Sequence, residues 1–365
     1  MPIKVLIIDD SQIVRKVLKE ELDQDPGIQV VGTAMDPIDA SDKIETLHPD
    51  VLTLDLELPK MDGLTFLRSL MRHHPLPVVV VSAYTTKGSR LAMEALESGA
   101  VEIVPKPGMG VHMKDMTAEL ITKIKGAAQA KFQSARTATT PPATTRAGAP
   151  EAVRATRPPP GGFEAPQTIL PPLVKPPAPE QVIAIGSSTG GTQALQYLLS
   201  RLPANMPPIL IVQHMPPGFT KTFSERLNAT SNLEVKEAEQ NDKVYPGRVL
   251  VAPGGFHMVL RRRLGTYSVE INNGPKVCRQ RPAVEVLFES VATVAGKHAF
   301  GVILTGMGND GAAAMLKMKQ AGAFNIAQDE KSCVVFGMPK EAIATGGVDK
   351  IVHLHRIPDT LHALF

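Results

Sequence analysis

Short apolar runs alternate with helical patterns through the first 125 residues of the chain. We predict strands at the five apolar runs 5–8, 28–31, 51–54, 78–81 and 101–104. Ser11 stands where the N-cap of a helix belongs. After it, apolar residues recur at the spacing of one core-facing helical stripe, namely at Ile13, Val14, Val17, Leu18 and Leu22. Alternating strands and helices predict an α/β domain with a parallel, doubly wound sheet.

The second half of the chain carries the same kind of pattern. Apolar runs at 182–185, 209–213 and 301–305 have the length and composition of buried strands. A helical pattern at 194–202 follows the first of them. If the three strands are parallel, the residues that follow them gather at one edge of the sheet.

A proline-rich segment separates the two patterned halves. Twelve of the 32 prolines fall between residues 134 and 180, which is too many for a packed core. Such a composition favours a semi-extended linker with local polyproline II structure, although a proline-motif ligand is the alternative. We therefore predict a domain at 1–122, the end of its last helix with the linker at 123–175, and a second domain at 176–365.

Composition and charge exclude several classes of protein. With 365 residues, 43% hydrophobic and 21% charged, the chain fits two soluble domains. We expect no signal peptide and no membrane insertion, since no apolar run approaches the roughly 20 residues of a membrane span. Cys278 and Cys333 stand far apart, so we expect no zinc site and a reducing cytoplasm. Residues 131–180 account for the whole net charge of +3, so we expect no nucleic-acid partner.

Polar residues of a coherent kind end four of the first five predicted strands. They are Asp9, Asp10, Asp55, Ser82 and Lys106. Carboxylates that converge on one small area repel one another, and a divalent cation such as Mg²⁺ relieves the repulsion. Lys106 and the Ser82 hydroxyl would then stabilise a phosphoryl group on the central carboxylate.

These residues resemble the receiver domain of response regulators. The matching motifs are Ile8-Asp9-Asp10-Ser11, Leu54-Asp55-Leu56, Met61-Asp62-Gly63, Val81-Ser82-Ala83 and Pro105-Lys106-Pro107. The resemblance implies a flavodoxin-like fold in which Asp55 accepts a phosphoryl group from a histidine kinase. It also implies that Asp9, Asp10 and Asp55 hold Mg²⁺. Ile103 replaces the aromatic switch residue usual in the family, which puts the usual switching mechanism in question.

A glycine-flanked turn, Gly186-Ser187-Ser188-Thr189-Gly190-Gly191, follows the strand at 182–185. With Ser188 at its centre it has the G-x-S-x-G form of a nucleophile elbow. The other two strands of this half lead to His214 and to Asp310. Together the three side chains make a hydrolytic triad in which His214 takes the Ser188 proton and Asp310 orients the imidazole.

Other assignments compete with this triad. His257, His353 and His355 are rival bases, and an α/β-hydrolase would need the order Ser, acid, His. His353 and His355 lie in an alternating segment without a glycine turn, so we prefer His214. The glycines beside Met307 would let backbone amides approach an oxyanion, and each such donor contributes about 3–4 kcal/mol to the transition state.

The second half resembles the catalytic domain of the CheB family of chemotaxis protein-glutamate methylesterases. Besides the elbow, the matching motifs are Gln213-His214-Met215-Pro216, Ala252-Pro253-Gly254, 281–288 and 304–311. The resemblance implies a Rossmann-like domain that hydrolyses glutamate γ-methyl esters on chemoreceptors and deamidates certain glutamines. It assigns Ser188 as nucleophile, His214 as base, Asp310 as acid and the Met307 amide as oxyanion donor, with no cofactor. Ser187 replaces a frequent alanine and supplies a second hydroxyl.

The order of the two halves suggests how they work together. We expect the unphosphorylated first domain to cover the esterase site and phosphorylation of Asp55 to weaken that docking. A transcription factor would instead need a helix-turn-helix and a basic face. The basic run Arg261-Arg262-Arg263 is a candidate for such a face, but with Leu264-Gly265 it fits a solvated hairpin turn. A non-catalytic scaffold is the other alternative, against which the Ser188, His214 and Asp310 set argues.

Overall fold

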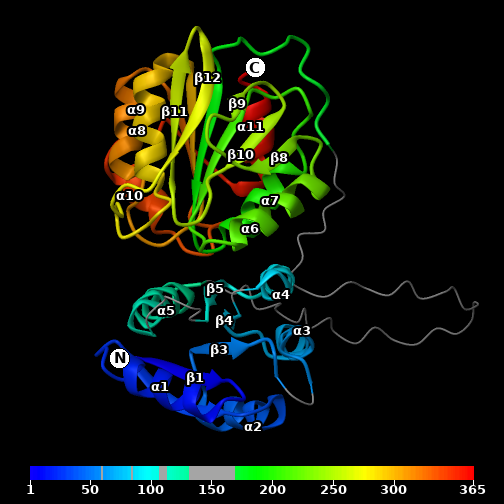
Figure 1. Ribbon diagram of the computed structural model, residues 1–365, viewed down its shortest axis with the longest axis vertical. Helices are drawn as coiled ribbons and strands as arrows, with labels where there is room; N and C mark the ends of the chain where they lie inside the picture. The colour runs from blue at the N-terminus through cyan, green and yellow to red at the C-terminus, as the bar shows by residue number, and fades with distance from the viewer. Residues whose placement is uncertain (59–60, 84, 107–112, 131–168) are drawn as a thin grey trace, which may run out of the picture.

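The structure, a computed structural model, describes residues 1–58, 61–83, 85–106, 113–130 and 169–365. It contains two α/β domains, drawn with the N-terminal domain below and the C-terminal domain above in Figure 1. Most of the predicted linker, and Pro107 of the Pro105-Lys106-Pro107 motif, lie outside the described residues. Within the described part, no helix is both long and apolar enough to cross a membrane.

The N-terminal domain is built on a five-stranded parallel sheet with the order β2-β1-β3-β4-β5. Its strands are β1 (Ile3–Ile8), β2 (Ile28–Ala34), β3 (Val51–Asp55), β4 (Val78–Ser82) and β5 (Glu102–Pro105). Its helices are α1 (Gln12–Leu22), α2 (Pro37–Leu47), α3 (Gly63–His73), α4 (Thr86–Glu97) and α5 (Met113–Ala127). This is the flavodoxin-like order, which confirms the predicted fold class.

Helix α1 differs from the prediction in one residue. Ser11 caps the helix by accepting from the Val14 amide, and Leu18 and Leu22 are buried as expected. Ile13, however, is 76% exposed. The buried face follows Val14, Leu18 and Leu22 at four-residue intervals, and Ile13 lies about 100° away from Val14 around the helix. The prediction that Ile13 faces the core is therefore wrong.

The C-terminal domain has a seven-stranded parallel sheet with the order β15-β14-β13-β6-β7-β10-β8. The strands are β6 (Val182–Ser187), β7 (Ile209–Gln213), β8 (Glu234–Glu237), β10 (Arg248–Val251), β13 (Ala299–Ile303), β14 (Phe324–Gln328) and β15 (Lys350–Val352). The three strands predicted from sequence, β13, β6 and β7, are neighbours at the centre. The strand order reverses at β6, so its carboxyl end lies at the switch point where α/β sheets bind ligands.

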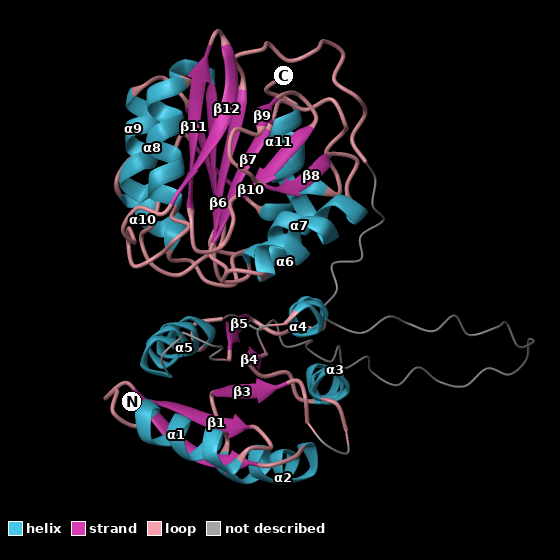
Figure 2. Cartoon of the chain, viewed as in Figure 1, coloured by secondary structure: helices cyan, strands magenta, loops and turns pink. Residues whose placement is uncertain are grey.

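Helices cover both faces of this sheet, as Figure 2 shows. They are α6 (Gly191–Leu199), α7 (Phe219–Thr230), α8 (Val284–Val294), α9 (Ala312–Gln320), α10 (Met338–Ala344) and α11 (Ile357–His362), with 3₁₀ turns η1 (Gly296–His298) and η2 (Leu354–Arg356). A smaller antiparallel sheet is added in the order β11-β12-β9, from β11 (His257–Arg263), β12 (Thr266–Asn272) and β9 (Lys243–Val244). The turn between β11 and β12 is Leu264-Gly265, both with positive φ, so the predicted hairpin turn is confirmed.

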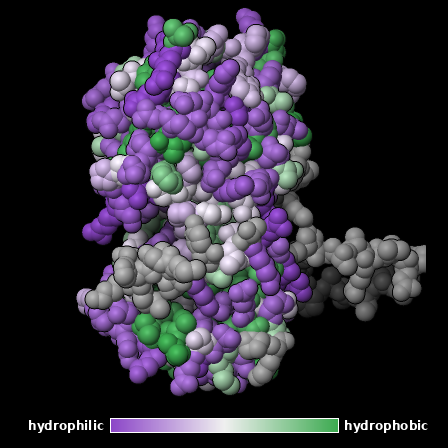
Figure 3. Space-filling view, in the orientation of Figure 1, coloured by the Kyte–Doolittle hydropathy of each residue, from purple (hydrophilic) through white to green (hydrophobic). Residues whose placement is uncertain are grey.

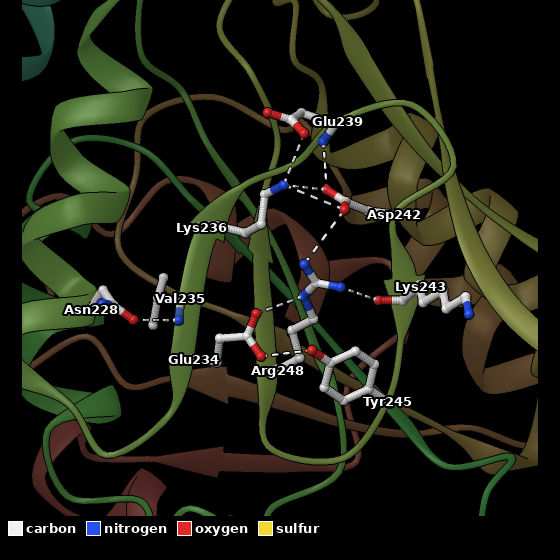
Figure 4. Close-up of polar contacts among 9 residues, drawn as sticks. All are labelled: Asn228, Glu234, Val235, Lys236, Glu239, Asp242, Lys243, Tyr245 and Arg248. Carbon is white, nitrogen blue, oxygen red and sulfur yellow. Dashed lines mark hydrogen bonds and ion pairs between the residues drawn. The ribbon is translucent and has the colours of Figure 1, made fainter.

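Charged side chains brace the edge strand β8 (Figure 4). Arg248 on β10 forms ion pairs with Glu234 on β8 at 3.4 Å and with Asp242 at 3.5 Å. The Tyr245 hydroxyl donates to Glu234, and Lys236 pairs with Asp242. The network fixes the edge strand and also places charges along it, which discourages pairing with another chain.

The two domains pack directly against each other. Figure 3 shows them as two lobes that meet at a waist. One cluster of buried apolar residues continues through both, and includes Leu96 and Ile103 of the N-terminal domain and Met215 of the C-terminal domain. Elements β5, α4 and α5 of the lower domain face the loops at the base of the upper one (Figure 1).

Candidate functional site

Ser188 lies in a sharp turn between β6 and α6. Its amide donates to the Thr305 carbonyl (3.0 Å) and its carbonyl accepts from the Gly191 amide (2.7 Å), so the turn is pinned on both sides. Gly190 has φ +75°, and a Cβ there would lie 2.5 Å from Val334. Only glycine fits this position without strain. The turn presents Ser188, 6% exposed, at the carboxyl edge of the sheet.

His214 and Asp310 form a buried pair beside this turn. His214 Nε2 lies 2.6 Å from Asp310 Oδ2, and the two residues are 4% and 2% exposed. The Asp310 carboxylate also accepts from the amides of Val284 (2.7 Å) and Glu285 (2.9 Å) at the N-terminus of α8. An ionised carboxylate is favoured at a helix N-terminus. It can accept a hydrogen bond from the Nε2–H group, which leaves the Nδ1 lone pair of His214 free to act as a base.

Ser188 and His214 line the same small cavity. No hydrogen bond joins their side chains among the residues that the structure describes. Such catalytic hydrogen bonds are often long without substrate and shorten when it binds. The structure therefore brings the three predicted residues to one edge of the sheet, with the His214–Asp310 contact formed and no hydrogen bond between the described Ser188 and His214 side chains.

The neighbouring Ser187 is held by a different set of contacts. It is fully buried, and its hydroxyl donates to Gln213 Oε1 at 2.7 Å. Gln213 Nε2 in turn donates to the Ser188 carbonyl at 2.9 Å, and the His214 amide donates to the Ser187 carbonyl at 3.1 Å. Ser187 and Gln213 thus tie the serine turn to the strand that carries His214.

The rival histidines have other partners. His257 Nε2 contacts the Pro275 carbonyl at 2.9 Å, and its Nδ1 accepts from the Ala283 amide at 3.3 Å, so both ring nitrogens are occupied. His355 stacks on Tyr197 with ring centroids 4.8 Å apart, and His353 packs against His355. These contacts favour His214 as the base.

The loop that contains Met307 passes close to the serine. A Cβ at Gly306 would lie 2.8 Å from Ser188 Cβ, so the loop approaches the serine only because residue 306 is glycine. Gly308 follows with φ +91°. The loop brings the backbone around Met307 to the same side of the sheet as Ser188, which is where an oxyanion donor belongs.

The N-terminal domain covers this site. The cavity at the serine is lined from below by Leu96, Val101, Glu102 and Ile103, and from above by Ser188, Gly190, Thr192, Gln213, His214, Met215 and Pro216. The buried Glu102 carboxylate accepts a short hydrogen bond from the hydroxyl of Thr189, the residue after Ser188. Lys123 on α5 pairs with the same carboxylate at 2.8 Å. A bulky substrate cannot reach Ser188 in this arrangement.

Further contacts hold the two domains together. Gln193 Nε2 donates to the Leu96 carbonyl at 2.8 Å. Arg226 on α7 forms an ion pair with Glu97 at the end of α4. On the other side, α5 packs so closely that a Cβ at Gly126 would contact Met307 and Thr189.

A second polar cluster lies at the carboxyl edge of the N-terminal sheet. Carboxylate oxygens of Asp9, Asp10 and Asp55 lie within 4.8 Å of one another. Lys106 Nζ lies 2.6 Å from Asp55 Oδ2 and 3.0 Å from Asp9 Oδ2. The Ser82 hydroxyl donates to the Gly88 carbonyl at 3.1 Å. All five predicted strand-end residues are thus at one edge.

Burial and charge set the protonation of this cluster. Burial raises the pKa of Asp9 above its usual value, against the opposing effect of Lys106. Burial also acts to lower the pKa of Lys106, but Asp55 and Asp9 outweigh it and the pKa is raised. Three carboxylates around one small space are the ligand type that Mg²⁺ prefers.

Sequence reasoning missed two residues that matter here. Gln213 directly precedes His214, and this adjacency was the available signal for its role in fixing the serine turn. Glu102 contacts the site only because the domains dock, and nothing in its local sequence indicates that contact.

Comparison with known proteins agrees with this geometry. The CheB methylesterase family matches residues 183–361, and the response regulator receiver domain family matches residues 5–118. Protein-glutamate methylesterase/protein-glutamine glutaminase 2 of Syntrophus aciditrophicus is 51% identical, over 98% of each chain. The protein-glutamate methylesterase/protein-glutamine glutaminase of Pectobacterium atrosepticum is 47% identical, over 99% of this chain and 96% of its own. The solved CheB methylesterase catalytic domain of Thermotoga maritima is 44% identical and superposes with a TM-score of 0.50, covering 51% of this chain and 98% of its own.

Proposed function

Because this chain belongs to the CheB family of protein-glutamate methylesterases/protein-glutamine glutaminases, we propose that it removes γ-methyl esters from glutamates of chemoreceptors and deamidates certain receptor glutamines. The observation that carries the proposal is the buried His214–Asp310 pair at 2.6 Å, beside a serine turn at the switch point of the sheet. We place the protein in the cytoplasm, where receiver domains meet their kinases.

The hydrolysis follows from the positions of these groups. His214 Nδ1 removes the proton from Ser188 as its Oγ attacks the ester carbonyl, and Asp310 stabilises the imidazolium. The Met307 amide stabilises the oxyanion of the tetrahedral intermediate. Methanol, or ammonia from a glutamine, leaves with the proton from His214. A water, deprotonated by the same histidine, then hydrolyses the acyl-enzyme to glutamate and free Ser188.

The N-terminal domain supplies the control. Asp55 accepts a phosphoryl group from a histidine kinase, and Lys106 and Ser82 stabilise its charge. Asp9, Asp10 and Asp55 would hold Mg²⁺, which neutralises charge on the transferring phosphoryl group when bound. Lys106 contacts Asp55 and directly follows β5, the strand that carries Glu102 and Ile103 into the interface. A change at Asp55 can therefore reach the docked surface through Lys106 and β5.

Docking and catalysis exclude each other in this scheme. Phosphorylation of Asp55 weakens the contacts of β5, α4 and α5 with the C-terminal domain and exposes Ser188. To change the open fraction from about 1% to about 99%, phosphorylation must shift the equilibrium by roughly 5.5 kcal/mol. With Ile103 at the position of the usual aromatic, this shift comes from the whole docked face rather than from rotation of one ring.

Methanol release from methylated receptor membranes tests both parts. We expect slow release by the full chain, faster release with a small-molecule phosphodonor, and fast release by the 176–365 fragment without one. Asp55→Ala should remove the response to the phosphodonor while leaving the basal rate. Equal rates for fragment and full chain without phosphate would contradict the inhibition, and no release under any condition would contradict the esterase activity.

A further inference from the structure

We propose that Glu285 is a positioning residue for this esterase, holding Asp310 against His214 by joining the first turns of α8 and α9. The inference rests on the proposed function, since it concerns the same triad. Glu285 belongs to the 281–288 motif and makes no contact with Ser188 or His214 among the described residues. Its effect on the reaction must therefore pass through Asp310.

Asp310 sits between two helix N-termini. Its carboxylate accepts from the amides of Val284 (2.7 Å) and Glu285 (2.9 Å) in the first turn of α8, whose N-cap residue Ala283 provides no side-chain cap. Asp310 therefore does the capping for α8, although it belongs to the loop before α9. The rotation of its carboxylate, and with it the position of Oδ2 against His214, is set by α8.

Glu285 plays the corresponding capping role at the N-terminus of α9. The N-cap of α9 is Gly311, which has φ +91° and no side chain to cap the helix. Glu285 Oε2 accepts from the Gly311 amide at 3.1 Å. Because Gly311 directly follows Asp310, Asp310 is fixed on both sides: its carboxylate by the α8 amides, and its following peptide by the Glu285 carboxylate. Each helix thus caps the other through one acidic side chain.

The charge of Glu285 should also affect the pH dependence of the reaction. Burial, and after it the nearby Asp310, raise the pKa of the Glu285 carboxyl. The backbone amides of Ala314 and Gly311 and the charge of Lys317 on α9 oppose this rise. Cys278, from the 273–281 loop, also faces these two carboxylates. When ionised, Glu285 adds negative potential next to the pair that must stabilise the His214 imidazolium. Removing that charge while keeping the hydrogen bond should therefore make His214 easier to deprotonate.

Three substitutions of Glu285 separate the hydrogen bond from the charge, and one control stands on the same helix. Glu285→Ala removes both, Glu285→Gln keeps an acceptor for Gly311 without the charge, and Glu285→Asp shortens the reach. The control, Glu289→Ala, also removes a contact between α8 and α9, the ion pair of Glu289 with Lys317 at 2.5 Å. The Glu289 side chain is 54% exposed and does not contact Asp310 or Gly311 among the described residues. All are made in the full chain and assayed for methanol release with saturating acetyl phosphate.

We expect Glu285→Ala to lower kcat about 10- to 100-fold with KM within about twofold, since transition-state rather than ground-state interactions are lost. Glu285→Gln should keep kcat within about threefold and move the acid limb of the kcat/KM profile down by about 0.5 pH unit, because the imidazolium loses a stabilising charge. Glu289→Ala should stay within about twofold.

Three results would overturn the proposal: a wild-type kcat for Glu285→Ala, an equal loss for Glu289→Ala, or a rise in KM with unchanged kcat. If Glu285→Ala does not fold, as judged by thermal unfolding, an unmoved acid limb for Glu285→Gln overturns it alone. The labelling rate of Ser188 by a fluorophosphonate probe is measured in parallel. If wild type labels but releases no methanol, the proposed function fails, while the labelling rates of the variants still decide the role of Glu285.

Discussion

At the residue scale, the structure shows different environments for the two adjacent serines of the glycine-flanked turn. Ser187 is fully buried and donates to Gln213, while Ser188 lines the cavity with His214. Ser188→Ala should abolish methanol release with the unfolding temperature unchanged. Ser187→Ala loses one buried hydrogen bond worth about 1 kcal/mol and should keep activity within about tenfold. The reverse outcome, in which only Ser187→Ala is inactive, would show that the nucleophile is misassigned.

Residues placed at strand ends were predictable, and residues that act by tertiary contact were not. Asp9, Asp55, Ser188 and Asp310 each follow an apolar run, and parallel strands bring such positions together. Which His214 nitrogen contacts Asp310 depends on how the fold places two residues that are 96 positions apart in the chain, and here it is Nε2. Glu102 depends on domain docking, which local pattern does not encode.

At the element scale, the edge of the C-terminal sheet offers a stability test. Arg248 is 12% exposed as a side chain and bridges Glu234 and Asp242 (Figure 4). Arg248→Met leaves Asp242 half-buried with one cation fewer, and should lower the free energy of unfolding by about 1–3 kcal/mol. Chemical denaturation measures this. Lys16→Ala, which removes the exposed Lys16–Glu20 pair, should cost under about 0.5 kcal/mol. Equal losses would show that the network does not stabilise the edge.

Apolar runs predicted all five strands of the N-terminal sheet, because buried parallel strands are apolar on both faces. In the C-terminal sheet they predicted only the three central strands, β13, β6 and β7. The antiparallel sheet β11-β12-β9 was anticipated only at its hairpin turn. Strand β9 contains just two residues, Lys243–Val244, and both are polar or half-exposed, so no apolar pattern marks it. Ile13 shows the opposite failure, in which an apolar residue fits the helical period yet faces solvent.

At the scale of the whole molecule, an ion pair between the domains allows the strength of docking to be changed by mutation. Arg226 pairs with Glu97, and Glu94 lies close enough to act on Arg226. Arg226→Glu would place like charges together, which should weaken docking by about 1–2 kcal/mol and raise the open fraction roughly 5- to 30-fold. Basal esterase activity without phosphodonor should rise accordingly. Glu97→Arg combined with Arg226→Glu should restore inhibition, and an activity that stays high in the double variant would exclude this pair as a source of docking energy.

A carboxyl at the same interface should make docking depend on pH. Burial raises the pKa of Glu119 on α5 from 4.5, and Lys123, Glu102 and Lys276 of the C-terminal domain also act on it. When the domains separate, Glu119 regains water and its pKa falls back towards the ordinary value. Protonation of Glu119 therefore favours docking. The stabilisation of the docked state by the protonated carboxyl is complete below pH 4.5 and is lost as pH rises through the raised pKa of Glu119 in that state.

The radius of gyration of the unphosphorylated chain, followed by small-angle X-ray scattering, should accordingly increase as pH rises from 4.5 through that value. Glu119→Gln mimics the protonated carboxyl at every pH, so the variant should stay more compact and lose this part of the pH dependence. The Lys123–Glu102 pair is present in both proteins, so the difference between the two curves isolates Glu119. Superimposable curves would mean that Glu119 keeps the same environment in both states, and that docking draws its energy from the apolar contacts of Leu96 and Ile103 and from the Glu102–Thr189 hydrogen bond instead.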